Sequence, residues 1–185
     1  MSILKKRTYY SIIYILPLVG LFCFSAYTCF NKEYQIKALF LYNFTQFITW
    51  PDKAFQNTES PLIIGILGDD PFGTYLDETV EGEKINGHPL AIRRYNNVKE
   101  AEYCHLIFIH KSKGNSIPQI ISDLKGKNIL TVSDAPDFIY QGGMIRFITV
   151  NNKIQFEINP EAIKAEELKV SSKLLSLAKI VIPEK

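Results

Sequence analysis

Three continuous apolar runs, separated by amphipathic segments, constrain the fold of this chain more than any other feature. The runs are "LIIGILG" (62–68), "CHLIFIH" (104–110) and "NILTVSD" (128–134). Strands without polar alternation are typical of parallel sheets, which helices bury on both faces. Helical patterns occur at 33–49, 72–82 and 116–126, and one more strand pattern at 89–95. We therefore expect an α/β fold with a mostly parallel sheet covered by helices on both faces.

The C-terminal part predicts a β-hairpin followed by two helices. Two strand patterns, 144–150 and 153–158, are joined by Asn151 and Asn152, which tolerate the left-handed backbone of a two-residue turn. This turn sets a register in which matched side chains face each other. The expected pairs are Phe147 with Phe156, Ile145 with Ile158, and Arg146 with Glu157. Helices are then expected after the Asn159-Pro160 cap and over about 171–182.

The charge distribution excludes the folded part of the chain from the usual nucleic-acid-binding class. The 185 residues carry a formal net charge of +2, with 46% hydrophobic and 22% charged side chains. Lys5, Lys6 and Arg7 hold three of the 21 basic side chains, and no acid precedes Glu33. The rest of the chain therefore has 18 bases against 19 acids. Binding to phosphate backbones needs a clustered basic surface, which this composition does not supply.

The pattern of the first 30 residues is typical of a segment that directs a protein to export. Their basic cluster is followed by an uncharged run over 8–30, a pattern typical of a secretory signal peptide. At about 20 residues, such a run also has the length of an uncleaved membrane anchor. Both alternatives export the remainder, because the positive charge stays on the cytoplasmic side. We expect a signal peptide or N-terminal membrane anchor at 1–30 and a single extracytoplasmic domain at 31–185.

The stretch "FLYNFTQFITWP" (40–51) belongs to a strongly aromatic helix predicted over 33–49. At about 100° per residue, its large apolar side chains fall in one arc, and polar side chains lie opposite. The arc contains Ile36, Phe40, Leu41, Phe44, Phe47 and Ile48, and the opposite side Gln35, Thr45, Gln46 and Thr49. This pattern predicts a helix that covers the sheet. Leu39, Tyr42 and Trp50 extend the apolar surface, which leaves a partner-binding face as the alternative.

No motif for catalysis, metal binding or a cofactor is present in the sequence. The three histidines lack metal-ligand spacing, and the serines lack a G-x-S-x-G elbow. In open parallel sheets, ligands bind beyond the carboxyl ends of the strands, so a small-molecule site is expected there. The polar residues at these ends are Asp69, Asp70, His110, Ser112, Ser133 and Asp134. Adjacent acids that end a strand before a Pro-Phe-Gly turn usually serve as turn and helix-cap residues, which is the alternative interpretation of Asp69 and Asp70. A hydrolase or transferase that uses Asp69, His110 and Ser133 is a further hypothesis.

Several stretches, in the same order, resemble the YfiR family of periplasmic regulatory proteins. They are "YQIKALFLYNFTQFITWP", "IGILGDDPFG", "INGHPLAIRRY", "CHLIFIHKS", "ILTVSDAPDFIYQGGMIRFITVNNKIQFEIN" and "LKVSSKLLSLAKIV". Together they cover essentially all of residues 33–181. The resemblance implies a non-enzymatic protein that binds the extracytoplasmic sensory domain of a membrane-bound diguanylate cyclase. Such binding represses the cyclase and so controls cyclic-di-GMP and biofilm growth.

The resemblance also implies a homodimer and a small-molecule ligand as further partners. Related domains form the sensory input of histidine kinases, so a ligand-binding sensor that reports to a kinase or cyclase is the alternative function. Partner contacts are expected on the aromatic helix and at the entrance to the hairpin. The expected contact residues are Leu39, Tyr42, Trp50, Gly142, Gly143 and Met144.

The cysteines differ from those of the best-known type of this family, in which disulfides are thought to tune the repressor. Cys23 and Cys29 lie in the targeting segment, which leaves Cys104 as the one cysteine of the exported domain. A single thiol cannot form an internal disulfide. We expect Cys104 to be a buried structural thiol, and an intramolecular redox switch is therefore in doubt.

Overall fold

The computed structural model describes residues 32–183, and its compact unit begins at Gln35. The targeting segment expected at 1–30 lies outside the described residues. Within the described range, no helix has both the length and the apolar character needed to cross a membrane.

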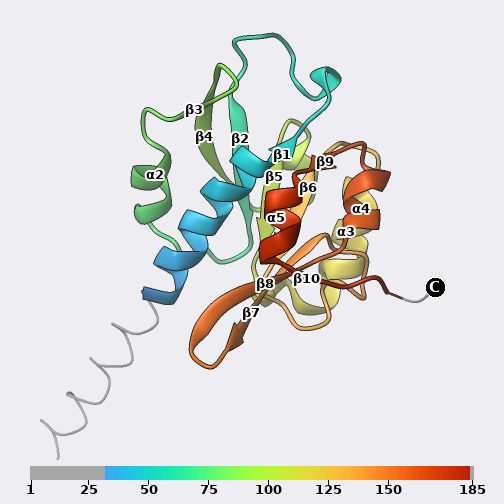
Figure 1. Cartoon of the computed structure of the whole chain (residues 1–185). Helices are drawn as coiled ribbons and strands as arrows, with labels where there is room; N and C mark the ends of the chain where they lie inside the picture. The colour runs from blue at the N-terminus through green and yellow to red at the C-terminus, as the bar shows by residue number, and fades with distance from the viewer. Residues whose placement is uncertain (1–31, 184–185) are drawn as a thin grey trace, which may run out of the picture. The chain divides into compact units, whose positions relative to one another are not determined.

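An eight-stranded sheet forms the core of this unit, in the order β10-β8-β7-β6-β5-β2-β4-β3 (Figure 1). The strands are β2 (Leu62–Leu67), β3 (Lys84–Ile85), β4 (His88–Tyr95), β5 (Leu106–Ile109), β6 (Leu130–Ser133), β7 (Ile145–Val150), β8 (Lys153–Ile158) and β10 (Lys179–Ile180). The neighbours β4, β2, β5, β6 and β7 are parallel, as are β8 and β10. The pairs β3–β4 and β7–β8 are antiparallel. The predicted mostly parallel α/β sheet is confirmed.

Helices cover both faces of the sheet. They are the helix over 32–47, which we call the aromatic helix, α2 (Tyr75–Val80), α3 (Ile117–Leu124), α4 (Pro160–Ala165), α5 (Ser172–Leu177) and the 3₁₀ turns η1 (Asp52–Ala54), η2 (Val98–Ala101) and η3 (Lys111–Ser116). On one face, α3 shares a buried apolar cluster with Ile107 and Ile109 of β5. Side chains alternate along a strand, so Phe108 points to the other face, where its ring lies 6.4 Å from that of Phe147.

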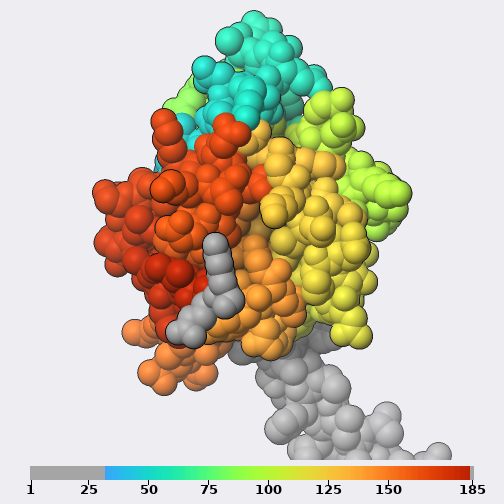
Figure 2. Space-filling view, turned by 90° about the vertical axis from the view of Figure 1, so that its right-hand side faces the viewer, coloured from blue at the N-terminus to red at the C-terminus, as the bar shows by residue number. Residues whose placement is uncertain are grey.

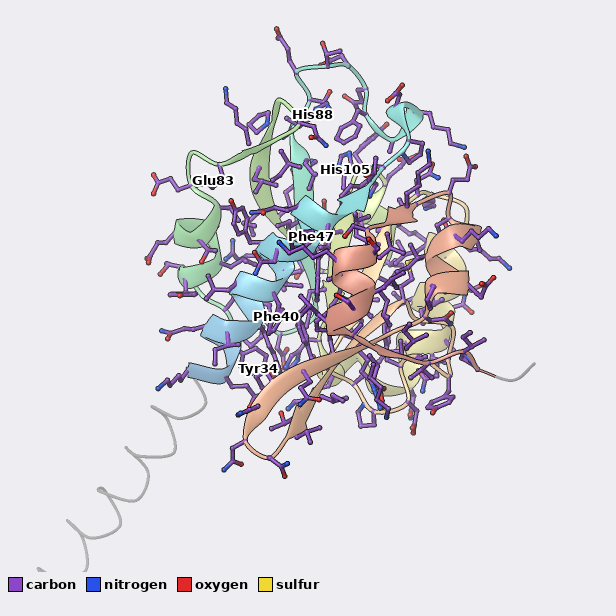
Figure 3. All side chains as sticks on the ribbon, viewed as in Figure 1. Tyr34, Phe40, Phe47, Glu83, His88 and His105 are labelled. Atoms are coloured by element: carbon purple, nitrogen blue, oxygen red, sulfur yellow. The ribbon has the colours of Figure 1, made fainter. Side chains whose placement is uncertain are left out.

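Phenylalanine rings join the aromatic helix to the β7–β8 hairpin. Phe44 stacks on Phe147 with 5.8 Å between ring centroids, and it meets Phe156 edge-on at 5.1 Å. Phe40, one turn earlier on the helix (Figure 3), meets Phe156 at 5.6 Å. Such pairs stabilise a core by about 0.5–1.5 kcal/mol beyond the area that they bury. The helix therefore covers the sheet, as its pattern predicts.

The hairpin has the predicted register. Phe147 pairs with Phe156, Ile145 with Ile158, and Arg146 with Glu157. Asn151 and Asn152 have φ angles of 50° and 58°, the left-handed values that a tight two-residue turn requires. Arg146 Nε donates to one oxygen of the Glu157 carboxylate at 2.8 Å, and Lys179 Nζ donates to the other at 2.9 Å. One acid thus links β7, β8 and β10.

The buried side of the aromatic helix differs from the predicted arc. Ile36, expected in the arc, is 38% exposed, whereas Thr45, expected on the polar side, is fully buried. The Thr45 hydroxyl is satisfied locally, because it donates to the Tyr42 carbonyl oxygen at 2.6 Å. Lys37 is also buried, and its ammonium group forms an ion pair with the carboxylate of Asp134. Polar side chains can be buried when their polar atoms have partners. The buried side of the helix therefore differs from the side that hydrophobicity alone predicts.

Two predicted helices end earlier than expected because short strands replace their last residues. The aromatic helix ends at residue 47, and β1 (Ile48–Thr49) pairs with β9 (Lys169–Val170) in a separate two-stranded sheet. Helix α5 ends at Leu177, and β10 follows it. Two-residue strands are too short to produce a recognisable period. The predicted cap is confirmed, because Asn159 Oδ1 accepts the Ala162 N–H at 3.1 Å.

Cys104 is the buried structural thiol that the sequence predicts. Its side chain is 4% exposed, and its Sγ donates to the Leu106 carbonyl oxygen at 2.8 Å. Burial raises the pKa of the Cys104 thiol to about 12. The reactive form of a cysteine is the thiolate, so this thiol is both enclosed and protonated at neutral pH.

We expect Ellman's reagent to react with Cys104 about 100-fold more slowly in the folded protein than in guanidinium chloride. The measurement follows colour release from the full chain with Cys23→Ser and Cys29→Ser, so that one thiol remains. The unfolded sample of the same protein is the control. Folded and unfolded rates within about threefold of each other would contradict an enclosed thiol.

Candidate functional site

The carboxyl ends of β2, β4 and β5 meet at the switch point of the sheet. The chain passes from β2 to β4 on one side and then returns to β5 on the other. Ligands of open α/β sheets bind at such points. A shallow cleft of about 260 Å³ lies here. Its lining residues are Gly68, Asp69, Tyr95, Asn96, Ser112 and Lys113.

Three of the expected ligand residues come together at this edge. The Asp69 N–H donates to Ser112 Oγ at 3.3 Å, and the Ser112 N–H donates to His110 Nδ1 at 3.2 Å. His110 Nδ1 also lies 4.0 Å from the Asp69 carboxylate. Burial lowers the pKa of His110, and the nearby carboxylates of Asp134 and Asp69 oppose this only in part. His110 is therefore a neutral hydrogen-bond acceptor within the loop after β5, and Ser112 Oγ connects this loop to the one after β2.

A buried ion pair lies beside this cluster. Lys37 Nζ, from the aromatic helix, lies 3.0 Å from Asp134 Oδ2, and both side chains are 4% exposed. The other oxygen of Asp134 accepts the Lys111 N–H at 3.2 Å. Asp134 is an expected site residue, whereas Lys37 is not. A lysine within an apolar helical stripe is the signal that identifies it, because a buried ammonium group requires an acid.

Two other expected site residues have structural roles. The buried Ser133 hydroxyl donates to the Ile109 carbonyl oxygen at 2.6 Å and accepts the Ala135 N–H at 3.0 Å. Asp70 accepts the Phe72 N–H at 2.8 Å and pairs with Arg94 at 2.7 Å. Asp70 is thus the turn residue that the alternative interpretation predicts.

The geometry does not assemble the catalytic arrangement that was hypothesised for Asp69, His110 and Ser133. The Ser133 hydroxyl proton is directed to the main chain, so His110 is not its acceptor. Among residues 32–183, no three or more His, Cys, Asp and Glu side chains gather in a way that could hold a metal ion. The cleft offers backbone and side-chain polar groups to a ligand rather than an activated nucleophile.

The expected partner residues on the aromatic helix separate into exposed and buried side chains. Leu39 is 44% exposed, and Tyr42 is half-buried, with its hydroxyl donating to the Glu83 carboxylate at 2.7 Å. Trp50 is 7% exposed, and its indole N–H donates to the His105 carbonyl oxygen at 3.0 Å. The expectation that Trp50 extends an exposed apolar surface is therefore wrong. The chain turns into β1 before Trp50 and carries its ring inward.

The hairpin entrance is also mainly structural. Gly142 is exposed with a φ of 97°, a left-handed value that favours glycine. Gly143 is buried, and a Cβ atom there would lie 2.2 Å from the Phe138 ring. Met144 is buried as well. Gly142 and Met144 instead line a pocket between α3 and α4, and neither presents an exposed apolar side chain to a partner.

The C-terminal segment exposes apolar side chains that the sequence analysis did not single out. Leu177, Ile180 and Ile182 are between 52% and 64% exposed. These three side chains lie within the six-residue stretch 177–182, which includes β10 at the edge of the sheet. Single exposed apolar residues are ordinary on protein surfaces, but a group of three large ones is typical of an interaction surface.

Comparison with known proteins agrees with this architecture. A search among curated proteins found no significant match. The model of the YfiR/HmsC-like family matches residues 34–179, from the aromatic helix to the first residue of β10. This family is regulatory and periplasmic. Since the match covers far more than half of the sequence, the chain belongs to the YfiR/HmsC-like family.

Proposed function

We propose that this protein is a non-enzymatic periplasmic regulator that binds the extracytoplasmic sensory domain of a membrane signalling protein and represses it. Membership of the YfiR/HmsC-like family supports a regulatory role in cyclic-di-GMP signalling. A diguanylate cyclase is therefore the proposed partner, with biofilm growth as the output. A homodimer would be compatible with this role.

The observation that carries this proposal is the exposed apolar surface on the aromatic helix. Ile36 and Leu39 are 38% and 44% exposed, although the opposite side of the same helix already covers the sheet. Residues three apart are neighbours on a helix surface, so these two side chains form one apolar site. An exposed site of this kind can bind an apolar groove or helix of a partner.

We expect a tagged full-length chain, exported through its own leader, to retain a membrane protein with an extracytoplasmic sensory domain from native membranes. Leu39→Asp is expected to reduce this retention about tenfold, because it places a charge in the contact. Asn57→Asp is the matched control, since it adds the same charge at an exposed loop position. Mass spectrometry identifies and quantifies the retained protein.

Equal retention by wild type and Leu39→Asp, with both folded by circular dichroism, would locate the contact elsewhere and remove this support. Failure of both proteins to retain any membrane protein would contradict the proposed function itself.

A second candidate is a ligand-binding sensor that reports to a histidine kinase or cyclase. It is favoured by the pocket of about 390 Å³ between α3 and α4.

A further inference from the structure

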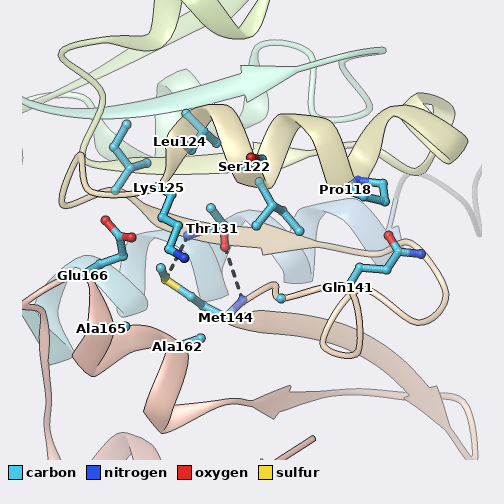
Figure 4. Close-up of a pocket in the computed structure, with 13 residues that line it drawn as sticks. Pro118, Ser122, Leu124, Lys125, Thr131, Gln141, Met144, Ala162, Ala165 and Glu166 are labelled. Atoms are coloured by element: carbon cyan, nitrogen blue, oxygen red, sulfur yellow. Dashed lines mark hydrogen bonds between the residues drawn. The ribbon is translucent and has the colours of Figure 1, made fainter. Parts of the chain in front are cut away.

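A pocket of about 390 Å³ lies between α3 and α4, away from the switch point of the sheet. The segment before β7 and the start of β6 complete its walls (Figure 4). Figure 2 shows the surface where the yellow region of α3 adjoins the orange-red region of α4. A volume of this size is typical of small-molecule sites.

The interior of the pocket is aliphatic. Ile121, Leu124, Ile129 and Met144 supply its large side chains, and no aromatic ring belongs to the lining. Near the hairpin and on α4, the wall includes the very small residues Gly142, Ala162 and Ala165, with the polar Gln141 beside them. Small side chains leave the space between the two helices open. An aliphatic chain matches these walls, and each CH₂ group that it buries contributes about 0.8 kcal/mol.

The polar atoms deep in the pocket already have partners. The Met144 N–H donates to Thr131 Oγ1 at 3.2 Å, and the Thr131 N–H lies 3.5 Å from Met144 Sδ (Figure 4). The two carboxylate oxygens of Glu166 accept the Gly126 N–H at 2.8 Å and the Asn128 N–H at 3.1 Å. These groups therefore do not need hydrogen bonds from a ligand, although Glu166 brings one negative charge to the lining.

Lys125 supplies the one cationic side chain of the lining. Figure 4 shows it extending from α3 toward Met144, with its ammonium group at the cavity. Among the described residues, Lys125 takes part in no ion pair. The carboxylate of Glu166 already accepts two N–H groups, whereas Lys125 has no ion-pair partner in the described part of the chain. This cation next to aliphatic walls therefore favours a ligand with one negative charge and an apolar body.

We propose that this pocket binds an aliphatic monocarboxylate of about eight carbon atoms, a ligand of the size that such a pocket encloses. Its chain lies on Ile121, Leu124 and Met144, and its carboxylate accepts hydrogen bonds from Lys125. One lysine matches one carboxylate, whereas a phosphate or a dicarboxylate would leave charge unpaired. The proposal rests on the pocket alone and does not require the proposed partner.

The test is a calorimetric titration of the full-length chain with octanoate, with 1-octanol and octylamine as neutral and cationic comparators. We expect saturable binding of octanoate, weaker binding of octanol, and the weakest binding of octylamine. Lys125→Gln is expected to weaken octanoate binding about tenfold and to remove the preference for octanoate over octanol. Lys127→Gln is the matched control, because Lys127 is exposed, two residues away and outside the lining.

A second pair of variants tests the cavity itself. Ala162→Leu and Ala165→Leu each place a larger side chain in the wall, and both are expected to abolish octanoate binding. Thermal unfolding verifies that each variant is folded, and two positions are used so that one misfolded variant does not decide the result. No saturable binding by the wild type, equal binding of octylamine and octanoate, or unchanged affinity in both filled variants would each overturn the proposal.

Discussion

Replacing Lys37 with methionine is expected to lower the free energy of unfolding by about 3–5 kcal/mol. The substitution keeps an unbranched side chain but removes the ammonium group that lies 3.0 Å from the buried carboxylate of Asp134. Removing one member of a buried pair costs this much because the remaining charge stays desolvated. Urea unfolding, followed by circular dichroism, measures the change.

Two further variants show whether the loss of stability arises from the loss of this ion pair. Lys53→Met removes a lysine whose ion pair with Glu167 is mostly exposed, so its expected cost is less than about 1 kcal/mol. Lys37→Met combined with Asp134→Asn removes both charges and is expected to recover about half of the loss. A single Lys37→Met variant as stable as Lys53→Met would show that the ion pair does not stabilise the fold.

The stability of the protein is expected to fall by about 3 kcal/mol between pH 6.5 and pH 4 because of His105. Burial lowers the pKa of His105 to about 4, from an ordinary value of 6.5. In the unfolded chain the imidazole binds a proton below its ordinary pKa, whereas in the folded protein it stays neutral. The protein therefore has this part of its stability in full above pH 6.5. It loses this part as the pH falls from the unfolded pKa of 6.5 through the folded pKa of about 4.

The surroundings of His105 explain why it resists protonation. Its ring stacks on Phe55 at 4.4 Å, on the opposite side from His88, which stacks on the same phenylalanine at 3.8 Å (Figure 3 labels both histidines). His105 Nδ1 accepts the N–H of Ile63 in β2 at 3.1 Å, a hydrogen bond that requires Nδ1 to be unprotonated. A proton on both ring nitrogens would break this hydrogen bond.

His105→Asn is the variant that isolates this effect, because asparagine retains an acceptor for the Ile63 N–H but does not titrate. Urea unfolding of wild type and variant should give stability curves that run parallel above pH 6.5, whereas between pH 6.5 and pH 4 only the wild type loses the roughly 3 kcal/mol that comes from His105. NMR titration of the wild type gives a direct check, since the His105 ring signals should not move between pH 7.5 and pH 5.5. Stability curves that stay parallel down to pH 4 would contradict the assignment.

The sheet and the hairpin could be predicted from sequence because their signals are local and repeated. Runs such as 62–67 carry enough apolar residues to identify a buried strand, and Asn151-Asn152 defines the register of the hairpin. The order of strands also places Asp69, His110 and Ser112 at one edge, because parallel strands end together. Whether they bind a ligand stays a prediction.

What could not be predicted depends on contacts between distant parts of the chain. Lys37 and Asp134 are 97 residues apart, and no local pattern connects them. Trp50 follows an exposed-looking run of aromatic residues, yet its indole N–H finds a carbonyl oxygen 55 residues away. Hydrophobicity identifies the side chains that can be buried, but tertiary partners decide which polar atoms accompany them.

The two ends of the sheet are its shortest strands. Strand β3 closes one end with residues Lys84 and Ile85, and β10 closes the other with Lys179 and Ile180. A two-residue strand offers very few free N–H and C=O groups to another chain, and each of these strands also carries a lysine. These strands cover only His88 and Pro89 of β4 and only Glu157 and Ile158 of β8. The charged side chains of Arg93, Arg94 and Lys153 on the uncovered stretches are therefore what opposes edge-to-edge aggregation.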